Sequence, residues 1–570
     1  MKLEEHRIRL MILLVFFALF ALVLLGRLYS LTVLDRAFLQ HQGDARSLRI
    51  MTIPSFRGMI VDVEGEPLAV STPVQSIWIN PKHVVASTDQ KKSLCQLLDI
   101  DPHVFDEKLA KYKAKEFLYL KRQVTPSVAD DIMALKIQGL YAQQEFKRYY
   151  PEVESMAQIL GFTNIDDHGI EGLELAYDSW LSGTAGKKRV IKDRMGRVIE
   201  ELDVLQETKP GQGLQLSIDR RIQFFAYNEL LKTLEKFDAK TGAVVVLDAH
   251  NGELLAIANA PSFNPNIREQ YPYHRYRNRA MTDAFEPGSV MKPFAIASAL
   301  ESGHFKPTSI IDTRPSTMMI QGHLIRDVHN YGVLDVTGVL RNSSNVGVSK
   351  MVLTSPPEQL IDLLKRSGLG ERTETSYPGE TEGAIVAPKQ ATPFVLATLS
   401  FGYGLSASAL QIAKAYSVFA NHGRLMPVSL LHNNEVTAPT QVMKPETADA
   451  LLAMLEATVV DGTGKAAMVP GYRVAGKTGT ALIAEKGGYA DKKYISSFVG
   501  IAPVSKPRLI VAVFIHEPDF HRGYYGAAVA APLFQKVMDM SLRLLNVPSD
   551  QHTMHKDEQH HSIAVAEEEL

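Results

Sequence analysis

An uninterrupted apolar run near the N-terminus limits what this chain can fold into more than any other feature. Residues 10–26 read LMILLVFFALFALVLLG and carry no charge. With the mostly apolar stretch 28–34, the run is long enough to cross the hydrocarbon core of a bilayer. A helix buried in a soluble core would show a polar face, which this segment lacks. The sequence therefore predicts a transmembrane helix followed by a large folded part.

Charges in front of the apolar run predict its orientation. Lys2, Arg7 and Arg9 precede it, so the positive-inside tendency leaves residues 1–9 in the cytoplasm and the chain beyond the helix outside. A cleaved signal peptide is the alternative, but the run exceeds the usual length of one and no clear cleavage site follows it. We predict an uncleaved single-pass anchor over residues 10–34.

Length and composition restrict the remaining part of the chain. Its 570 residues exceed what one hydrophobic core supports, so two or more domains are expected. A formal net charge of −2 provides no basic excess to neutralise phosphates, which argues against nucleic acid as a partner. The single cysteine, Cys95, excludes an internal disulfide framework and a cysteine-based metal site. We expect neither a metal nor a cofactor.

Turn-forming residues at 209–213 divide the chain beyond the anchor into two stretches. Residues 35–212 combine hairpin patterns with polar helical patterns, which indicates a mixed α/β domain. Residues 213–548 run from strands through many helices back to strands and a final helix, which predicts an antiparallel sheet with helices packed on it. The polar segment 549–570 is expected to be disordered. The predicted fold class is α+β.

Several elements of the second stretch have clear local signals. A long helix is expected over residues 219–237. Residues 243–248 and 253–258 are apolar strands joined by a turn of hairpin composition. Their continuous apolar character indicates a sheet buried on both faces. Another strand is expected at 472–474, before a Lys-Thr-Gly motif.

Ser289 is the first candidate for chemistry. A Pro-Gly turn delivers it to the start of an apolar, alanine-rich segment that reads as a helix. Backbone N–H groups are unpaired there and the helix dipole is positive, which favours a developing alkoxide. Lys292 follows at i+3, so its amine lies on the same face and can take the hydroxyl proton. The pair predicts a nucleophile with its base, although a serine that only caps the helix fits the same letters.

Ser343 and Asn345 form a second candidate group, in the triplet Ser-Ser-Asn. A hydroxyl and a carboxamide two residues apart can enter one cavity from a loop or a helix end. Ser343 would then relay a proton and Asn345 would bond a substrate amide. Such triplets are common in polar loops, so this signal is weak alone.

The Lys-Thr-Gly motif supplies a third group. Lys477 and Thr478 present a cation and a hydroxyl that suit a carboxylate. Gly479 lets a substrate lie against a strand edge because it has no Cβ. The backbone N–H of Thr480, with that of Ser289, is expected to form an oxyanion hole for a tetrahedral intermediate.

The same region also matches a phosphate-binding loop. Residues 471–478 satisfy the pattern G-x-x-x-x-G-K-[ST] letter for letter. Such a loop should follow a buried apolar strand and open a helix, whereas Pro470 precedes this one and Gly479 follows it. We therefore disfavour a nucleotide site.

Together and in this order, S-x-x-K, S-x-N and K-T-G are the set associated with penicillin-binding proteins and serine β-lactamases. The single anchor, the Arg57-Gly58 segment, residues 169–174 and the stretch 401–404 extend the likeness. The chain resembles class B penicillin-binding proteins over nearly its whole length, and their division-specific, FtsI-type members in particular. Asn345 is similar to the division type, because elongation-type relatives more often carry aspartate there. Val63 departs from the family, whose pedestal motif usually has arginine at that position.

The resemblance implies a non-catalytic pedestal over residues 35–212 and a serine β-lactamase-like transpeptidase domain over residues 213–548. It implies an enzyme of the bacterial inner membrane with its catalytic domain in the periplasm. Such an enzyme cross-links peptidoglycan stem peptides at the division septum and is a target of β-lactams. The implied partners are a membrane-embedded septal glycosyltransferase and other divisome proteins.

The resemblance also implies roles for the candidate residues. Ser289 attacks the D-Ala-D-Ala carbonyl and forms an acyl-enzyme, and Lys292 is the base. Ser343 and Asn345 act as proton relay and amide anchor. Lys477 and Thr478 bind the substrate carboxylate, and Gly479 and Thr480 complete the substrate-binding residues. The alternatives are an elongation-type class B transpeptidase and a catalytically inactive divisome scaffold.

Overall fold

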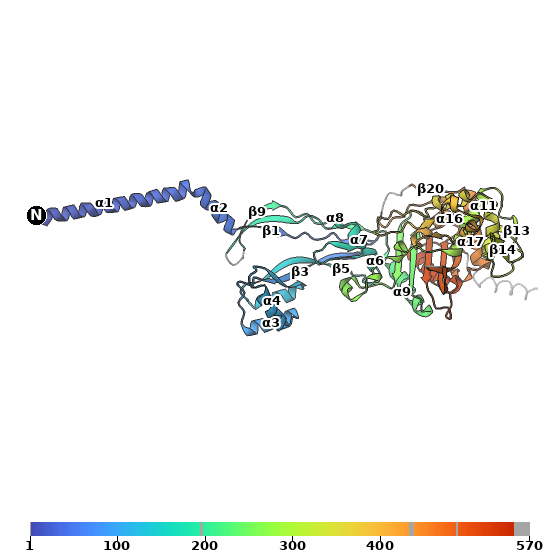
Figure 1. The fold of residues 1–570 in the computed structure, drawn as a ribbon, viewed down its shortest axis with the longest axis horizontal. Helices are drawn as coiled ribbons and strands as arrows, with labels where there is room; N and C mark the ends of the chain where they lie inside the picture. Colours follow the sequence, from blue (N-terminus) through green and yellow to red (C-terminus); the bar gives the residue numbers. More distant parts are fainter. Residues whose placement is uncertain (1, 194–197, 433–437, 486–487, 552–570) are drawn as a thin grey trace, which may run out of the picture. The chain divides into compact units, whose positions relative to one another are not determined.

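The computed structural model describes residues 2–193, 198–432, 438–485 and 488–551 (Figure 1). Its contacts divide the chain into two units. The first comprises Met1–Arg57, Thr72–Lys147 and Ser182–Gly211. The second comprises Gly58–Ser71, Arg148–Leu181 and Gln212–Leu570. Two segments from the stretch predicted to be the pedestal thus belong to the second unit.

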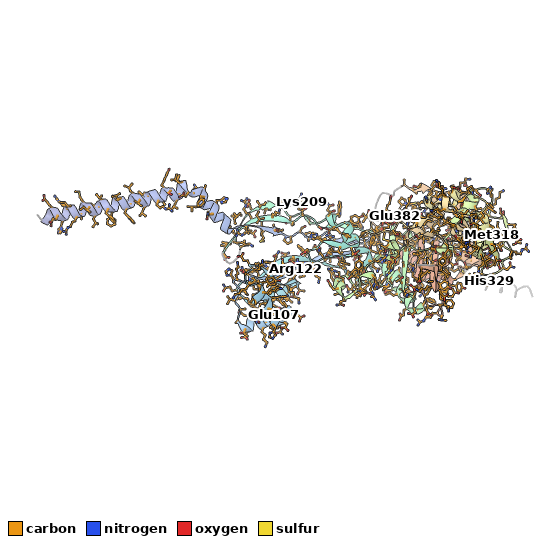
Figure 2. All side chains as sticks on the ribbon, in the orientation of Figure 1. Glu107, Arg122, Lys209, Met318, His329 and Glu382 are labelled. Carbon is orange, nitrogen blue, oxygen red and sulfur yellow. The ribbon has the colours of Figure 1, made fainter. Side chains whose placement is uncertain are left out.

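The N-terminal apolar run is helical. Helix α1 (Lys2–Tyr29) continues into the π-helical turn η1 (Ser30–Leu34). The span Glu4–Leu34 has a mean hydropathy of 3.0 and none of its apolar window is buried. Its described side chains project freely from the helix (Figure 2). Length and composition therefore fit a membrane-spanning helix, and helix α2 (Arg36–Ser47) follows it.

The rest of the first unit contains strands and short polar helices. Strands β1 (Leu48–Ile53), β8 (Gly186–Lys192) and β9 (Val198–Gln206) form an antiparallel sheet in that order. The end of β3 (Pro67–Ile79) pairs with β4 (Leu118–Val124). A small core beside this pair is built from apolar side chains that include Ile77, Leu94, Leu98, Phe105 and Ile132. The expectation of a mixed α/β module is confirmed.

The second unit is organised around a five-stranded antiparallel sheet in the order β12-β11-β23-β22-β21. The strands are β11 (Thr241–Asp248), β12 (Leu254–Ala260), β21 (Ala475–Glu485), β22 (Gly488–Ala502) and β23 (Leu509–His516). Every residue of β12 is buried, and so is nearly every residue of β11 and β23. The predicted hairpin and its burial on both faces are confirmed.

Alternation along β11 separates two hydrophobic cores. Val244 and Val246 pack into a core shared with α9 (Arg220–Phe237) and α18 (Gly526–Leu544). Val245, between them, packs into the larger core on the other face, shared with α11 (Lys292–Glu301), α16 (Ala409–Ala420) and α17 (Pro445–Asp461) (Figure 1). Because successive strand residues point to opposite faces, one apolar run serves both helical layers.

Helix α9 confirms the prediction for residues 219–237. Asp219 is its N-cap, and the Asp219 side chain accepts a hydrogen bond from the Arg221 backbone N–H. Asp238, with φ of 47°, ends the helix in the left-handed conformation. Both ends of the helix are therefore set by residues at the ends themselves.

The prediction of a strand at residues 472–474 is wrong. Pro470 and Gly471 turn the chain just before it, and Gly471 has φ of +84°. The strand β21 begins at Ala475 and includes the Lys-Thr-Gly motif itself. Because β21 is last in the strand order, the motif lies on the edge strand of the sheet.

Only the first residues of the predicted disordered tail are described. Asp550 accepts a hydrogen bond from the Arg473 backbone N–H at 2.7 Å. The Gln551 backbone N–H donates to the Gly471 carbonyl at 3.1 Å. Residues 552–570 lie outside the described residues.

Candidate active site

Ser289 lies in a tight turn that leads into a buried helix. The turn is the 3-10 element η4 (Gly288–Met291), and Lys292 is the first residue of α11. The sequence predicts Ser289 at the start of an α-helix, but the α-helix begins three residues later, at Lys292. In 3-10 geometry side chains at i and i+3 lie directly above one another. The Lys292 Nζ is 3.0 Å from the Ser289 Oγ.

The turn that carries Ser289 is fixed by its neighbours. The Gly288 N–H donates to the Gly402 carbonyl at 3.1 Å. Gly402 has φ of +88°, and a Cβ there would lie 2.0 Å from the Gly288 carbonyl oxygen. The Tyr416 hydroxyl donates to the Val290 carbonyl at 2.6 Å. These contacts leave the turn little freedom to move the nucleophile.

Lys292 is almost completely buried, with a relative exposure of 1%. Its amine also contacts the Ser343 carbonyl at 2.5 Å and the Ser343 Oγ at 2.9 Å. Burial, with a further contribution from the charge of Lys477, lowers the pKa of Lys292 well below its ordinary value of 10.5, and Asp327 opposes that shift. A lysine with so low a pKa can be neutral and accept a proton from Ser289.

The Ser-Ser-Asn triplet divides its side chains between two tasks. Ser343, with φ of 59°, reaches Lys292. The Ser344 Oγ caps α13 (Asn345–Val352) by accepting from the Gly347 N–H at 2.8 Å. The Asn345 amide donates to the Arg326 carbonyl at 3.0 Å. In the described part of the chain Asn345 makes no hydrogen bond to Ser289 or Lys292.

Asp327 is a site residue that sequence reasoning missed. Its carboxylate accepts from the Ser344 hydroxyl at 2.5 Å and from the backbone N–H groups of Asn345 and Val346 at 2.5 and 3.0 Å. The side chain is buried, at 8% exposure. It therefore holds the loop that presents Ser343 to the amine. A single aspartate so far from the triplet in a polar loop has no sequence signal that distinguishes it.

Lys477 is the second buried amine of the site, with 0% exposure. Its Nζ donates to the Thr478 carbonyl at 3.0 Å, and burial lowers its pKa to about 7. The Thr478 hydroxyl is 2.9 Å from that of Thr463. In the described residues no carboxylate pairs with Lys477, so no acidic side chain there neutralises its charge.

Gly479 brings the edge strand against the Ser289 turn. A Cβ on Gly479 would lie 3.1 Å from the Val290 Cγ1 and 3.3 Å from the Pro287 carbonyl oxygen. The Thr480 Oγ1 accepts from the Gly526 N–H at 3.0 Å, at the start of α18. Residues on either side of Ser289 therefore lie against the Lys-Thr-Gly strand. The S-x-x-K and K-T-G motifs are thus neighbours in space.

The stretch 401–404 joins the same two elements. The Gly404 N–H donates to the Glu286 Oε1 at 2.8 Å, just before the Ser289 turn. The Tyr403 hydroxyl accepts from the Leu482 N–H of β21 at 3.2 Å. In the sequence this stretch is only part of a family likeness, and in the structure its contacts join the Ser289 turn to β21.

Comparisons with known proteins agree across the chain. Residues 242–539 match the family model described as the penicillin binding protein transpeptidase domain, and residues 52–216 match the penicillin-binding protein dimerisation domain. The probable peptidoglycan D,D-transpeptidase PbpC of Pseudomonas aeruginosa is 44% identical over 551 residues, covering 96% of this chain and 97% of the relative.

Two further matches come from other genera. The peptidoglycan D,D-transpeptidase FtsI of Escherichia coli strain K12 is 40% identical over 533 residues, covering 92% of this chain and 90% of the relative. The apo structure of the TP domain of Burkholderia pseudomallei penicillin-binding protein 3 has a TM-score of 0.55 and 40% identity. That match covers 59% of this chain and 98% of the solved one.

Proposed function

This chain belongs to the penicillin-binding protein transpeptidase family, and from that premise we propose that it cross-links stem peptides at the division septum through an acyl-enzyme on Ser289. It is a peptidoglycan D,D-transpeptidase that binds β-lactams. The septal role and the residue assignments are the proposed part.

The observation that carries the assignments is the contact of one buried amine with two hydroxyls. Lys292 Nζ is 3.0 Å from the Ser289 Oγ and 2.9 Å from the Ser343 Oγ. A neutral Lys292 takes the Ser289 proton while the Ser289 Oγ bonds to the penultimate D-Ala carbonyl carbon. The C–N bond then breaks, and Ser343 passes the proton to the departing D-Ala amine. The amine of a second stem peptide resolves the ester by the reverse path.

The neighbouring motif residues support the same reaction. Lys477 and Thr478 suit the terminal carboxylate of the donor peptide. The backbone N–H groups of Ser289 and Thr480 would stabilise the oxyanion, since Gly479 already touches the residues that flank Ser289. Asn345 donates to the Arg326 carbonyl through its amide nitrogen, and its second N–H and its Oδ1 would bond a substrate amide.

Labelling with fluorescent penicillin tests Ser289. We expect Ser289→Ala to abolish labelling of the full chain, because no other hydroxyl accepts the acyl group. Ser302→Ala, at the other end of α11, is the matched control and should label like the wild type. Labelling that survives Ser289→Ala would remove the assignment. If the wild type does not label at all, the inactive scaffold becomes the better account.

The septal role is supported by Asn345 in the triplet and by relatives that carry the name FtsI. A depletion strain distinguishes it from an elongation role. We expect this chain to restore division to cells that form filaments after losing their division transpeptidase. Rescue only of cells that round up after losing the elongation enzyme would favour the elongation type.

We place the N-terminus in the cytoplasm and the second unit in the periplasm. The basic residues before α1 support this orientation. An impermeant maleimide should label Lys365→Cys, on an exposed position of α14 (Pro357–Arg366), in spheroplasts without lysis. Labelling only after lysis would reverse the orientation. The anchored position also supports a membrane-embedded glycosyltransferase and other divisome proteins as partners, which co-purification from cross-linked cells would detect.

A further inference from the structure

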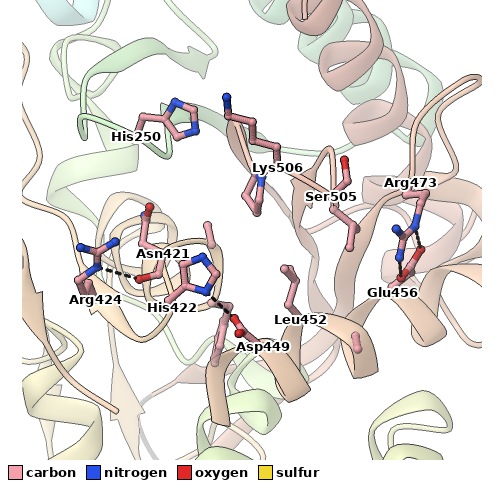
Figure 3. A pocket seen from close by; sticks show the side chains of 15 residues that line it. His250, Asn421, His422, Arg424, Asp449, Leu452, Glu456, Arg473, Ser505 and Lys506 are labelled. Carbon is pink, nitrogen blue, oxygen red and sulfur yellow. Dashed lines mark hydrogen bonds and ion pairs between the residues drawn. The ribbon is translucent and has the colours of Figure 1, made fainter. Parts of the chain in front are cut away.

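A pocket of about 450 Å³ lies in the second unit among residues that the reaction does not use (Figure 3). Its walls come from four places: the β11–β12 turn, the end of α16 with the segment after it, one side of α17, and the β22–β23 turn with the lead into β21. Ser289, Lys292, Ser343 and Lys477 are not among its lining residues. The volume is within the range of small-ligand sites.

The pocket has an excess of free positive charge. Asp449 is paired with His422 at 2.8 Å, and Glu456 is paired with Arg473 at 2.6 Å, so both acidic side chains of the wall are already engaged. Lys506 and Arg424 have no carboxylate partner in the described part of the chain.

Arg424 and Lys506 are also exposed to an incoming ligand. Among the described residues, the Arg424 guanidinium donates only to the Asn421 carbonyl, through Nε at 3.3 Å. Both side chains are exposed and come from different segments of the wall (Figure 3). Two separated cations suit a ligand that carries more than one anionic group.

The remaining wall favours a peptide over a free inorganic anion. Phe419, Leu452 and Val504 give the pocket an apolar part beside its cations. A ligand with aliphatic segments between its charges would use both.

The side-chain carboxylate of Asp550 bonds two residues at the rim of the pocket. Asp550 accepts from the Arg473 N–H at 2.7 Å and from the Ser505 N–H at 3.1 Å, and both of these residues line the pocket. The rim therefore has donors that suit an acidic side chain of an extended segment.

We propose that this pocket binds a peptide bearing two or more carboxylates, held by Arg424 and Lys506. Two sources share that chemistry. One is this chain, whose sequence beyond Gln551 includes Glu567, Glu568 and Glu569. The other is a separate acidic peptide. The proposal concerns a site apart from the reaction centre and does not depend on the assignment of Ser289.

Fluorescence anisotropy tests the proposal with labelled AVAEEEL, the sequence of residues 564–570, and with AVAQQQL as the probe that lacks the three glutamate charges. The protein is the full chain in detergent and a variant that ends at Gln551. We expect AVAEEEL to bind at least one of them and AVAQQQL to bind neither. The double variant Arg424→Gln/Lys506→Gln, made in each form, should weaken binding at least about tenfold.

The double variant Lys236→Gln/Lys365→Gln is the control, since it removes two exposed positive charges elsewhere and should bind like the parent. Retained penicillin labelling of every variant checks that it is folded. Tighter binding to the shortened chain than to the full chain identifies the chain itself as the source, because an internal segment would compete. Equal binding identifies a separate peptide. The proposal is overturned if AVAEEEL binds neither form, if AVAQQQL binds equally well, or if the Arg424/Lys506 variant binds like its control.

Discussion

At the scale of single residues, the site contains two buried amines, those of Lys292 and Lys477. In the described residues no carboxylate forms an ion pair with either of them. Burial lowers the pKa of Lys477 to about 7 and that of Lys292 well below 10.5. The charge of Lys477 adds to the shift of Lys292. Strongly shifted pKa values on neighbouring titratable groups are typical of functional sites.

The pH dependence of penicillin acylation follows from those two pKa values. Falling pH protonates Lys292 and removes the base, so the second-order acylation rate should decline on the acid side. Rising pH beyond about 7 removes the charge of Lys477 and with it the attraction for the β-lactam carboxylate. We expect a bell-shaped profile in stopped-flow acylation. A rate independent of pH across the neutral range would contradict both roles.

Replacing Lys477 by methionine should separate stability from function. The pKa of Lys477 is about 7 in the folded protein against an ordinary 10.5, so between these values the unfolded chain binds more protons and stability rises with pH. Lys477→Met removes that cost. We expect about 1–4 kcal/mol more stability in urea unfolding at neutral pH, with greatly slowed acylation.

Lys365→Met, on the exposed side of α14, is the control for that experiment and should leave the urea midpoint nearly unchanged. A Lys477→Met protein that is less stable than the wild type would show that the buried amine stabilises the fold, which is the opposite of the expected effect.

Asp327 should act on the reaction through Ser343. Asp327→Asn replaces one oxygen of a carboxylate that accepts three hydrogen bonds, from Ser344, Asn345 and Val346. Loss of one charge-assisted bond costs about 1.5–3 kcal/mol, so acylation should slow by about 10- to 100-fold.

The pH profile distinguishes this positioning role from general damage to the fold. Because Asp327 opposes the lowering of the Lys292 pKa, Asp327→Asn should move the acid limb of the acylation profile to lower pH. Asp312→Asn, on an exposed ion pair with Arg314, is the control and should change neither rate nor profile. If the acid limb of the Asp327→Asn profile does not move, Asp327 has only a structural role.

Sequence reasoning reached the residues with recognisable spacing and missed those without it. Ser289 and Lys292 follow one another within a single turn, and the triplet and Lys-Thr-Gly are contiguous. Asp327 joins the site only through the path of the chain in space, which no local pattern records. The same limit applies to Asn345, whose bond to Arg326 depends on where the preceding loop lies.

At the scale of elements, the edge strand β21 and the turn η4 together determine the site. The local signal for a strand through Lys-Thr-Gly is weak, because Gly476 and Gly479 interrupt it. Pairing with β22 supplies the missing stabilisation, with Lys477 opposite Val499 and Gly479 opposite Ser497. Long-range pairing of this kind overrides local propensity.

Gly479→Ala should disturb the contact between these two elements. The added Cβ would lie 2.3 Å from the Ser497 Oγ and 3.1 Å from the Val290 Cγ1, so either the strand or the turn must shift. We expect about 1–3 kcal/mol of destabilisation in thermal unfolding and a larger relative loss of acylation. Gly213→Ala, whose Cβ would come no closer than 3.4 Å to another atom, is the control. Wild-type acylation by Gly479→Ala would mean that the close packing is not required.

At the scale of the whole molecule, the chain's order in sequence differs from its grouping in space. The segments Gly58–Ser71 and Arg148–Leu181 belong to the second unit, although a reading by turn composition assigns them to the pedestal. Two contacts explain this grouping: β2 (Ile60–Val61) pairs in parallel with β10 (Leu214–Gln215), and the Gln158 amide donates to the Pro261 carbonyl at 3.0 Å. The anchor helix, the α+β class and the central hairpin were predictable because their signals are continuous in sequence.

The central claim is that distant segments of the chain converge on one activated hydroxyl. Mass spectrometry of the full chain after penicillin treatment, with the adduct mapped to a peptide, tests it most directly. We predict a single penicilloyl group on the peptide that contains Ser289, and none in Lys292→Ala over the same time. An adduct on any other residue, or a Ser289→Ala protein that still gains the full mass, would contradict that claim.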